Sequence, residues 1–275
     1  MAKSPNLTTV GLLQFAPVFG DIPANIRKID HLIDNSPPVD LWVLPELASS
    51  GYNFTSREEA FASSEPPEDS LFVQYLTEKA REQETIFISG INERDGDHLY
   101  NSAVGVGPQG LMGVYRKLHL FNREKQYFKP GNQTPPIWDT PIGKIGILIC
   151  FDWMFPEVWR ILALRGAEMI CHPSNLVLPY CQSAIPGYAL TNRIFIATTN
   201  RVGREKDLEF TGQSVLVNPK GEYLLKGHCS DEEPLISEIN LSEASDKQMT
   251  PFNDAIEDRR EDIYEITEKN NTRND

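Results

Sequence analysis

Three short segments of the chain each carry a residue suited to acid–base or nucleophilic chemistry. LPELASSGY contains Glu46, YRKLHLF contains Lys117 and LICFDWMFPE contains Cys150. A thiolate can attack a carbonyl or nitrile carbon while a basic group takes up and returns the proton. In that scheme Cys150 is the nucleophile and Glu46 transfers the proton, whereas the Lys117 ammonium favours the thiolate and stabilises charge on the substrate oxygen. The combination predicts covalent acyl transfer.

Each of these residues ends or follows a stretch typical of a β-strand, at residues 41–46, 111–117 and 144–150. In a layered α/β protein, residues just past strand ends converge on one crevice, so their distance in sequence is no obstacle to contact. A turn and a helix are predicted directly after Cys150. The N-terminus of that helix would favour a thiolate.

The remaining pattern alternates strands with helices in two rounds, which favours two sheets with outer helices. GVGPQG predicts a hairpin turn, and Pro219, Lys220 and Gly221 predict another. The pattern alone does not separate this arrangement from an ordinary doubly wound α/β protein. The predicted helices are 25–35, 70–84, 156–166 and 182–192, and the other strands are 8–15, 85–91, 101–106, 167–173, 193–200, 212–218, 222–227 and 234–240.

The chain resembles the carbon-nitrogen hydrolase family, also called the nitrilase superfamily. The resemblance rests on the three segments above and on VGLLQFAPVFGDIPANIRKI, RKLHLFNREKQYFKPG, GAEMICHPSN, NRVG and GQSVLVNPKGE, and so covers nearly the whole chain. It implies a catalytic Glu, Lys, Cys triad in this order. It also implies an α/β fold, a four-layer α-β-β-α sandwich, which we expect as a single domain over residues 1–265 followed by a polar tail at 266–275.

The resemblance implies further site residues. Glu124 matches a second glutamate that orients the lysine and the substrate, and the backbone amide of Phe151 matches a donor to the oxyanion. Tyr52 and Asn175 match positions near the substrate entrance. Together with Tyr52, the aromatic side chains of Trp153 and Phe155 are expected to form a compact pocket for small aliphatic substrates.

Two histidines offer a rival mechanism. A cysteine paired with His119 or His172 would suggest a papain-like thiol hydrolase, but neither protease signature around a cysteine is present. Of the other cysteines, Cys171 is expected in the core and Cys181 as a partly exposed thiol near the pocket. No HExxH, paired CxxC or nucleotide-binding glycine motif occurs, so we expect neither a metal nor a cofactor.

Composition narrows the classes of partner and compartment. The formal net charge of -13 over 275 residues argues against a nucleic-acid partner, which normally meets a basic surface. Neither a signal peptide nor a membrane-spanning stretch is evident, and 4 cysteines do not suggest a disulfide framework. We therefore expect a cytoplasmic protein without a membrane partner. The family resemblance implies a homodimer or higher homo-oligomer.

The leading prediction is a thiol hydrolase that cleaves carbon–nitrogen bonds of small amides or N-carbamoyl compounds. The CFDWMFPE context resembles amidases, carbamoylases and short aliphatic nitrilases, so a small aliphatic nitrilase is the close alternative. A non-catalytic binding scaffold is the alternative from a different class, although it would not need Glu46, Lys117, Glu124 and Cys150 together. The triad specifies the bonds that react and leaves the substrate open.

Overall fold

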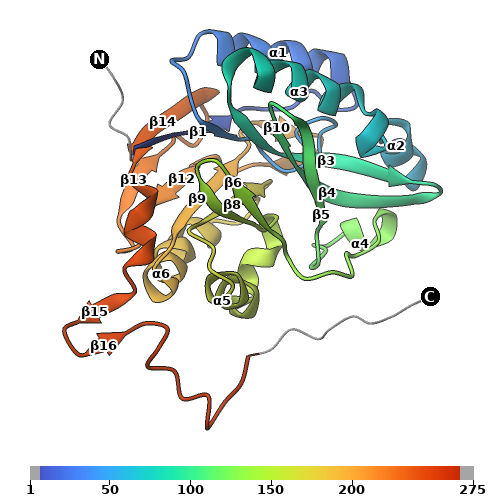
Figure 1. The fold of residues 1–275 in the computed structure, drawn as a ribbon. Coiled ribbons are helices and arrows are strands. Elements are labelled where there is room, and N and C mark those ends of the chain that lie inside the picture. Colours follow the sequence, from blue (N-terminus) through green and yellow to red (C-terminus); the bar gives the residue numbers. More distant parts are fainter. Residues whose placement is uncertain (1–6, 267–275) are drawn as a thin grey trace.

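The computed structural model describes residues 7–266, which form two facing β-sheets with helices on both outer faces (Figure 1). Helices α1 (Ile22–Asp34) and α3 (Leu71–Gln83) cover one sheet, whereas α5 (Pro156–Leu164) and α6 (Cys181–Asn192) cover the other. The four-layer α-β-β-α sandwich expected from the sequence is therefore confirmed. All but Ile266 of the predicted tail, residues 266–275, lies outside the described part of the chain.

The first sheet supplies two of the three segments that carried the chemical prediction. Its strands β1, β2 and β3 are parallel, while β4, β5 and β14 pair with their neighbours antiparallel. The turn predicted at GVGPQG joins β4 to β5, where Gly107 pairs with Gly110. In spatial order the strands are β14 (Glu233–Ile239), β1 (Thr8–Gln14), β2 (Leu41–Val43), β3 (Ile86–Asp95), β4 (His98–Gly107) and β5 (Gly110–Arg116).

The second sheet repeats the parallel centre and antiparallel edges of the first. Its central strands β7, β8 and β9 are parallel, and the outer strands pair antiparallel. The carboxyl ends of the parallel strands β2, β7 and β8 lie at one edge of the two facing sheets. Ligands of α/β proteins bind at this edge of a parallel sheet. The spatial order is β13 (Tyr223–Lys226), β12 (Val215–Val217), β9 (Phe195–Asn200), β8 (Met169–Ser174), β7 (Gly143–Ile147) and β6 (Ile137–Thr140).

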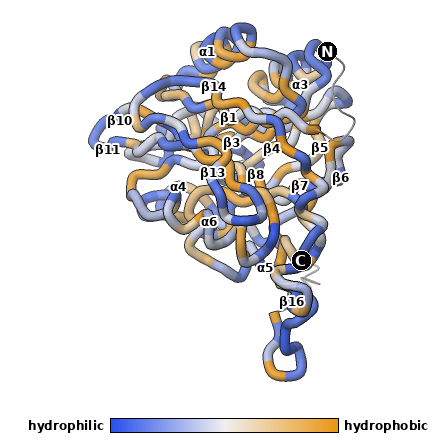
Figure 2. Tube along the Cα trace, turned by 90° about the vertical axis from the view of Figure 1, so that its left-hand side faces the viewer, coloured by the Kyte–Doolittle hydropathy of each residue, from blue (hydrophilic) through white to orange (hydrophobic). Residues whose placement is uncertain are grey.

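Alternation along the strands divides the apolar side chains between two cores. In β1, Val10 and Leu12 are buried between the sheets, whereas Leu13 packs beneath α1 and α3 with Trp42. Helix α1 begins where Asp21 accepts a hydrogen bond from the Ala24 amide at 2.9 Å, as is usual for a helix N-cap. Figure 2 shows the hydrophobic residues concentrated in the central strands.

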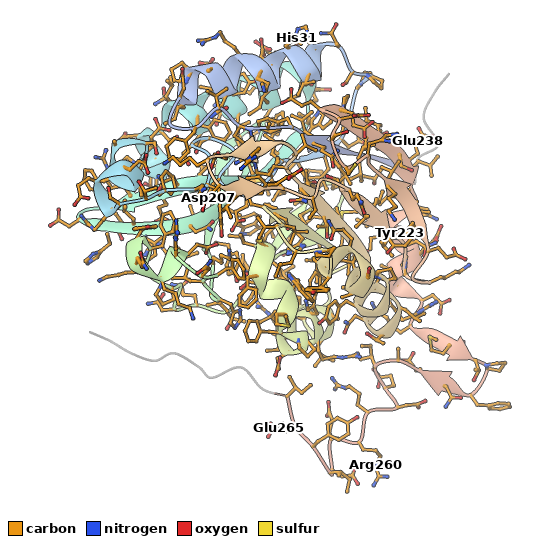
Figure 3. The ribbon with its side chains drawn as sticks, turned by 180° about the vertical axis from the view of Figure 1, so that it is seen from behind. His31, Asp207, Tyr223, Glu238, Arg260 and Glu265 are labelled. Atoms are coloured by element: carbon orange, nitrogen blue, oxygen red, sulfur yellow. The ribbon has the colours of Figure 1, made fainter. Side chains whose placement is uncertain are left out.

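Two small hairpins and two short helices complete the fold around this frame. The hairpin β10 (Arg204–Glu205) and β11 (Leu208–Glu209) lies beside the first sheet, and helices α2 (Arg57–Ala62) and α4 (Glu124–Tyr127) lie near the start of β4. The chain then leaves the body as an arm with the hairpin β15 (Gln248–Thr250) and β16 (Asn253–Asp254). Arg260 and Glu265 lie on this arm, away from the sheets (Figure 3).

Two local predictions need correction. The predicted strand 41–46 ends at Val43, because the chain turns at Glu46 just after Pro45, which has no backbone N–H to donate. Cys181 was expected to be partly exposed but is fully buried at the start of α6, so that prediction is wrong. The helix packs its first turn against the second sheet, which covers the thiol. Cys171 is buried in β8 as predicted.

Candidate active site

The turns that follow β2 and β5 bring Glu46 and Lys117 together on the first sheet. A side chain at Gly90 of β3 would come within 2.4 Å of the Glu46 Cα, so only glycine lets the turn pack this closely on the strand. Lys117 follows β5 directly, and its amide donates to the Asn101 carbonyl of β4 at 2.9 Å. Both carboxylate and ammonium are thus fixed by strands rather than by free loops.

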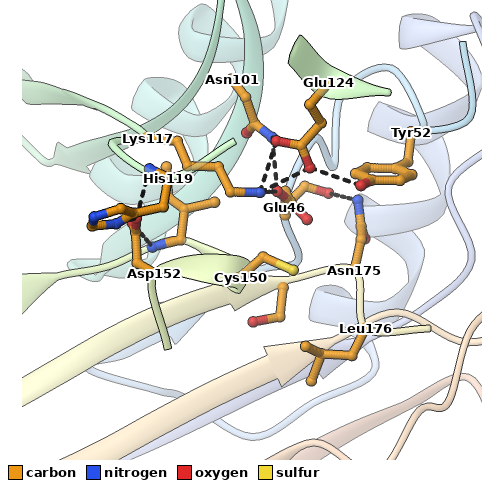
Figure 4. Close-up of polar contacts among 12 residues, drawn as sticks. Glu46, Tyr52, Asn101, Lys117, His119, Glu124, Cys150, Asp152, Asn175 and Leu176 are labelled. Carbon is orange, nitrogen blue, oxygen red and sulfur yellow. Dashed lines mark hydrogen bonds and ion pairs between the residues drawn. The ribbon is translucent and has the colours of Figure 1, made fainter. Parts of the chain in front are cut away.

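An ion network surrounds the Lys117 ammonium (Figure 4). Its Nζ donates to Glu46 Oε1 at 2.6 Å and to both carboxylate oxygens of Glu124 at 2.9 Å. Tyr52 donates its hydroxyl to Glu124 Oε1 at 2.7 Å. Lys117 and Glu46 are wholly buried and Glu124 is 4% exposed, so the charges attract without much screening by water. The structure therefore brings four of the predicted site residues into contact.

Asn101 also belongs to this network and was not predicted. Its side-chain amide donates to Glu46 Oε1 at 2.7 Å and to Glu124 Oε2 at 3.4 Å. The available signal was a single asparagine opening the strand-like run NSAVGV, but nothing local indicates which way it faces. Only the pairing of β4 with β3 and β5 turns the side chain toward Glu46.

The proton states follow from burial and these contacts. Burial opposes the charge on Lys117, yet the carboxylates of Glu124 and Glu46 outweigh it and raise the Lys117 pKa, so the side chain stays an ammonium. Burial raises the pKa of Glu46 above its usual value, with Lys117 working against the rise. Glu46 Oε2 has no hydrogen-bond partner within residues 7–266. This oxygen is free to accept a proton.

Cys150 lies at the end of β7 in an unusual backbone conformation. It opens a 3₁₀-helix, Cys150–Met154, with a φ of 38°. Such a conformation is strained for a residue with a side chain and persists only where the surroundings hold it. Asp152 Oδ2 accepts from the preceding Ile149 amide at 2.9 Å, and His172 Nε2 lies 2.8 Å from the Cys150 carbonyl oxygen. Hydrogen bonds to the backbone at Ile149 and Cys150 therefore fix the direction in which the thiol points.

The electrostatics of Cys150 modify the expectation made from the sequence. Burial and the Glu46 carboxylate raise the thiol pKa well above its usual value, although the Lys117 charge and the backbone amide of Asn175 lower it. The lysine thus acts in the predicted direction but is outweighed. The turn predicted after the cysteine is a 3₁₀-helix, and the helix predicted from residue 156 is α5, which begins at Pro156. At rest, Cys150 is a neutral thiol.

The two histidines are occupied elsewhere. His119 Nδ1 lies 2.8 Å from Asp152 Oδ1, and its ring stacks on Phe155 with centroids 3.7 Å apart. His172 uses Nε2 for the Cys150 carbonyl and Nδ1 for Thr198 Oγ1 at 3.0 Å, and burial lowers its pKa to about 4. Since a carbonyl only accepts, Nε2 carries the proton. In the described residues neither imidazole hydrogen-bonds to the thiol, as a papain-like site would require.

The other predicted residues surround this centre at different distances. Asn175 donates its side-chain amide to the Glu46 carbonyl at 2.8 Å. Phe151 packs on Phe121 with ring centroids 5.1 Å apart. Trp153 packs against the core between the second sheet and its helices, and its carbonyl accepts from Trp159 Nε1 at 3.3 Å. Asn175 is therefore in direct contact with the network, while Trp153 belongs to the packing beside it.

A cavity of about 270 Å³ opens beside the network and is lined in part by Tyr52 and Glu124. We call it the Tyr52 pocket. The loop carrying Tyr52 is held by Glu205 of β10, whose Oε1 accepts from the amides of Tyr52, at 2.9 Å, and Asn53. Glu205 Oε2 accepts from Arg201 at 2.7 Å, and both side chains are buried. We call these contacts of Glu205 with the Tyr52 loop and Arg201 the Glu205 clamp. It was not predicted, because Tyr52 and Glu205 lie about 150 positions apart in the sequence.

The part of the chain that the structure describes is residues 7–266. No group of three or more His, Cys, Asp or Glu side chains in this range is arranged to hold a metal ion. No helix in the same range is both long and apolar enough to cross a bilayer.

Comparison with known proteins places the chain in a family. The model of the family "Carbon-nitrogen hydrolase" matches residues 9–247. A protein named nitrilase from Pyrococcus abyssi is 42% identical, with 94% of this chain and 99% of that protein covered. The crystal structure of a carbon-nitrogen hydrolase from Helicobacter pylori G27 superposes with a TM-score of 0.81 at 29% identity and covers 94% of this chain and 97% of that one.

A third match concerns chemistry at a cysteine. A variant of the amidase from Nesterenkonia sp. AN1 is described as showing Michael addition of acrylamide at its active-site cysteine. It superposes with a TM-score of 0.74 at 25% identity, covering 93% of this chain and 98% of that one. Family model, relatives and solved structures agree over nearly the whole described chain. The chain belongs to the carbon-nitrogen hydrolase family of the nitrilase superfamily, a family of hydrolases.

Proposed function

We propose that this hydrolase cleaves the carbon–nitrogen bond of small-molecule amides or N-carbamoyl compounds through an acyl-enzyme on Cys150. The observation that carries the proposal is the state of Glu46. Its Oε1 is held by Lys117 and Asn101, while Oε2 is buried and has no partner in the described residues. A carboxylate with raised pKa and one free oxygen beside a neutral thiol is suited to take the thiol proton.

The first half-reaction uses three groups. Glu46 accepts the proton of the Cys150 thiol as the sulfur attacks the substrate carbonyl carbon, forming a carbon–sulfur bond. The carbonyl electron pair moves to oxygen, where the Lys117 ammonium and the Phe151 amide stabilise the negative charge. When the tetrahedral intermediate collapses, the carbon–nitrogen bond breaks and Glu46 returns the proton to the departing ammonia or amine. The product from an amide is a thioester on Cys150. The equivalent product from an N-carbamoyl compound is a thiocarbamate, whose hydrolysis gives a carbamic acid that loses carbon dioxide.

The second half-reaction reverses these roles with water. Glu46, again ionised, takes a proton from water as its oxygen attacks the thioester carbon. The same donors stabilise the second tetrahedral intermediate. Its collapse breaks the carbon–sulfur bond, releases the carboxylic acid and returns the proton to the Cys150 sulfur. One carboxylate thus serves both half-reactions.

Nitrile hydrolysis is the second candidate, and the 42% identity to a protein named nitrilase favours it. Attack of Cys150 on a nitrile carbon gives a thioimidate, with a proton delivered to nitrogen. Water then adds to that carbon, and loss of ammonia gives the same thioester as before. The two candidates differ only in this added hydration, so Glu46, Lys117 and Cys150 keep their roles.

Ammonia release from a panel of small amides, N-carbamoyl compounds and aliphatic nitriles tests the proposal. We expect the Cys150→Ala variant to lose at least about 10⁴-fold of the wild-type rate, as removal of a catalytic nucleophile does. Cys171→Ala is the matched control, because it also removes a buried thiol but one in the core of β8. Thermal unfolding of each variant reports whether the fold is retained.

Each outcome has a distinct meaning. Release from amides or carbamoyl compounds that requires Cys150 supports the leading proposal, and Cys150-dependent release from nitriles alone supports the second candidate. Equal loss in both cysteine variants would contradict a catalytic Cys150. Silence of the wild type on the whole panel would oppose the proposal and favour a non-catalytic binding scaffold.

Three further expectations accompany this proposal. We infer that residues 1–265 act as one domain, that the protein works in the cytoplasm and that it forms a homodimer. The arm beyond β14 supports the last inference, since Phe252 is 92% and Ile263 71% exposed. Apolar side chains this exposed are typical of surfaces that meet another protein.

A further inference from the structure

We propose that the Tyr52 pocket binds the acyl side chain of the substrate, and that this side chain is uncharged, apolar and longer than a two-carbon unit. The inference rests on the proposed function and adds a substrate class to it. Tyr52 and Glu124 line the pocket and also belong to the network around Lys117. The pocket therefore lies beside the network that holds Lys117, on the side of Tyr52 and Glu124.

The walls of the pocket are mostly apolar. Burial of each methylene group against such walls stabilises a bound ligand by removing it from water. The apolar side chains that line the pocket are Phe54, Phe121, Phe128, Val177, Leu178 and Leu208.

The polar groups nearest the network already have partners. The Tyr52 hydroxyl donates to Glu124, and both oxygens of Glu124 accept from Lys117. Burial, together with the charge of Glu124, raises the Tyr52 pKa well above its usual value and keeps the hydroxyl protonated. These groups can orient the reacting carbonyl end, but they offer no free partner to a charged side chain.

The two charged side chains at the rim compensate each other. Arg123 and Asp207 are both exposed and both line the pocket, and Figure 3 shows Asp207 on the turn between β10 and β11. Asp207 Oδ1 accepts from Asn53 Nδ2 at 2.7 Å, and this bond and the Arg123 charge lower the Asp207 pKa. A substrate tail of either sign would meet one attracting and one repelling charge, so the rim does not select for charge.

The volume of the pocket and one exposed leucine indicate the length of the side chain. About 270 Å³ corresponds to about nine water molecules at ~30 Å³ each, so acetamide would leave much of it unfilled. Leu178 in the pocket wall is 47% exposed. An apolar substrate chain would cover this leucine and displace the water from the pocket.

The first test is a homologous series of primary amides from acetamide to hexanamide, together with 6-aminohexanamide and adipamic acid. We expect kcat/KM to rise about fourfold per methylene, the factor given by ~0.8 kcal/mol per buried group, until the pocket is full. Both charged analogues should fall at least about tenfold below hexanamide. If only nitriles are hydrolysed, the matching nitrile series gives the same comparison. A flat or falling series, or a preference for one charged analogue, would overturn the inference while leaving the proposed function intact.

A binding measurement keeps the inference testable without turnover. Titration calorimetry of the Cys150→Ala variant should show tighter binding of hexanamide than of acetamide, again by about fourfold per methylene. If this trend holds while no compound is hydrolysed by the wild type, the proposed function fails but the pocket assignment stands. If binding is independent of chain length, the assignment fails regardless of activity.

A pair of leucine variants locates the effect in the pocket. Leu178→Asp places a charge in the wall and should lower the hexanamide to acetamide ratio of kcat/KM at least about tenfold. Leu224→Asp on β13 is the matched control, because Leu224 is 39% exposed and does not line the pocket. The control should leave the ratio unchanged. Equal ratios in both variants would contradict the assignment.

Discussion

The first sheet contributes charged side chains to the site, whereas the second contributes uncharged ones at Cys150 and His172. Turns at the ends of β2 and β5 in the first sheet carry the charged groups, Glu46 and Lys117, and β4 adds Asn101. The second sheet contributes a neutral thiol at Cys150 and the uncharged His172 that binds its carbonyl. In the resting protein the charged groups thus come from one sheet and the proposed nucleophile, Cys150, from the other. We propose that the thiolate forms when the thiol proton passes from Cys150 to Glu46.

Two buried groups of the site, Glu46 and His172, couple folding to pH in opposite directions. Burial raises the pKa of the acid Glu46 and lowers that of the base His172, because both charged forms are disfavoured away from water. The stability that Glu46 contributes through its raised pKa is present at low pH and is lost as the pH rises. The stability that His172 contributes through its lowered pKa is present above the pKa of the unfolded chain and is lost as the pH falls. Variants of Glu46 and His172 can therefore be told apart by the pH dependence of their stability.

Among variants that keep Cys150, the largest effect is expected from the charged groups of the first sheet. Lys117→Met should lower kcat/KM at least about 10³-fold, because one oxyanion donor is worth 10² to 10³ and Glu46 also loses its counter-charge. Lys79→Met is the matched control: Lys79 is 7% exposed and pairs with Asp30 and Asp34, far from the site on α3. Steady-state kinetics on the best substrate of the panel measures both.

A histidine variant sharpens the same test. His119→Ala should retain most of the activity, since the His119 ring bonds to Asp152 rather than to the thiol. If His119→Ala alone abolished formation of the acyl-enzyme while Lys117→Met kept it, the base would be the histidine. The division of roles between the sheets would then be wrong.

The second prediction concerns the neutral side. The unfolded chain protonates His172 below about pH 6.5, whereas the folded protein does so only near pH 4, so unfolding takes up a proton between these values. The free energy of unfolding should therefore fall by about 3 kcal/mol as the pH is lowered through this window. His172→Gln should remove this part of the slope, as measured by urea unfolding at several pH values.

The control for that measurement is an exposed histidine. His31→Gln on α1 should keep the wild-type dependence of unfolding free energy on pH. If His172→Gln and the wild type showed the same slope between pH 4 and 6.5, the imidazole would not be held neutral. The contrast between the charged side chains of the first sheet, Glu46 and Lys117, and the uncharged His172 of the second would then lose its main support.

The smallest effect on activity is expected at Glu205 of β10, which holds the loop between the Tyr52 pocket and the network around Lys117. Glu205→Gln should lower kcat about tenfold, because the loop that aims Tyr52 at Glu124 loses its charged acceptor. Glu59→Gln is the matched control, since it removes a carboxylate bound to Lys206 in the same hairpin but without contact to the Tyr52 amide. That variant should stay within about twofold of wild type.

A double-mutant cycle identifies Glu205 as a positioning residue. If Glu205 acts through the Tyr52 hydroxyl, adding Glu205→Gln to Tyr52→Phe should cause little further loss of kcat. Full additivity of the two losses would show that Glu205 affects activity by another route, such as general stability. Thermal unfolding of each variant separates that case from a change in the site.

Much of the fold and the main residues of the candidate site could be predicted because their signals are local. Alternating apolar residues and turn motifs marked the strands and helices, and the segments around Glu46, Lys117 and Cys150 carried the family resemblance. Asn101 and the Glu205 clamp could not be predicted in the same way. Their partners lie 55 and about 150 positions away, so no pattern within either segment shows the contact.

Residue types and their order along the chain are enough to say which groups are available for chemistry. The proton states of these groups depend on the folded chain, because a pKa responds to burial and to charges from distant segments. Lys117 alone would favour a thiolate at Cys150, yet burial and Glu46 together raise the thiol pKa. The same reason explains Cys181, whose exposure was set by how α6 packs on the second sheet rather than by its own neighbours.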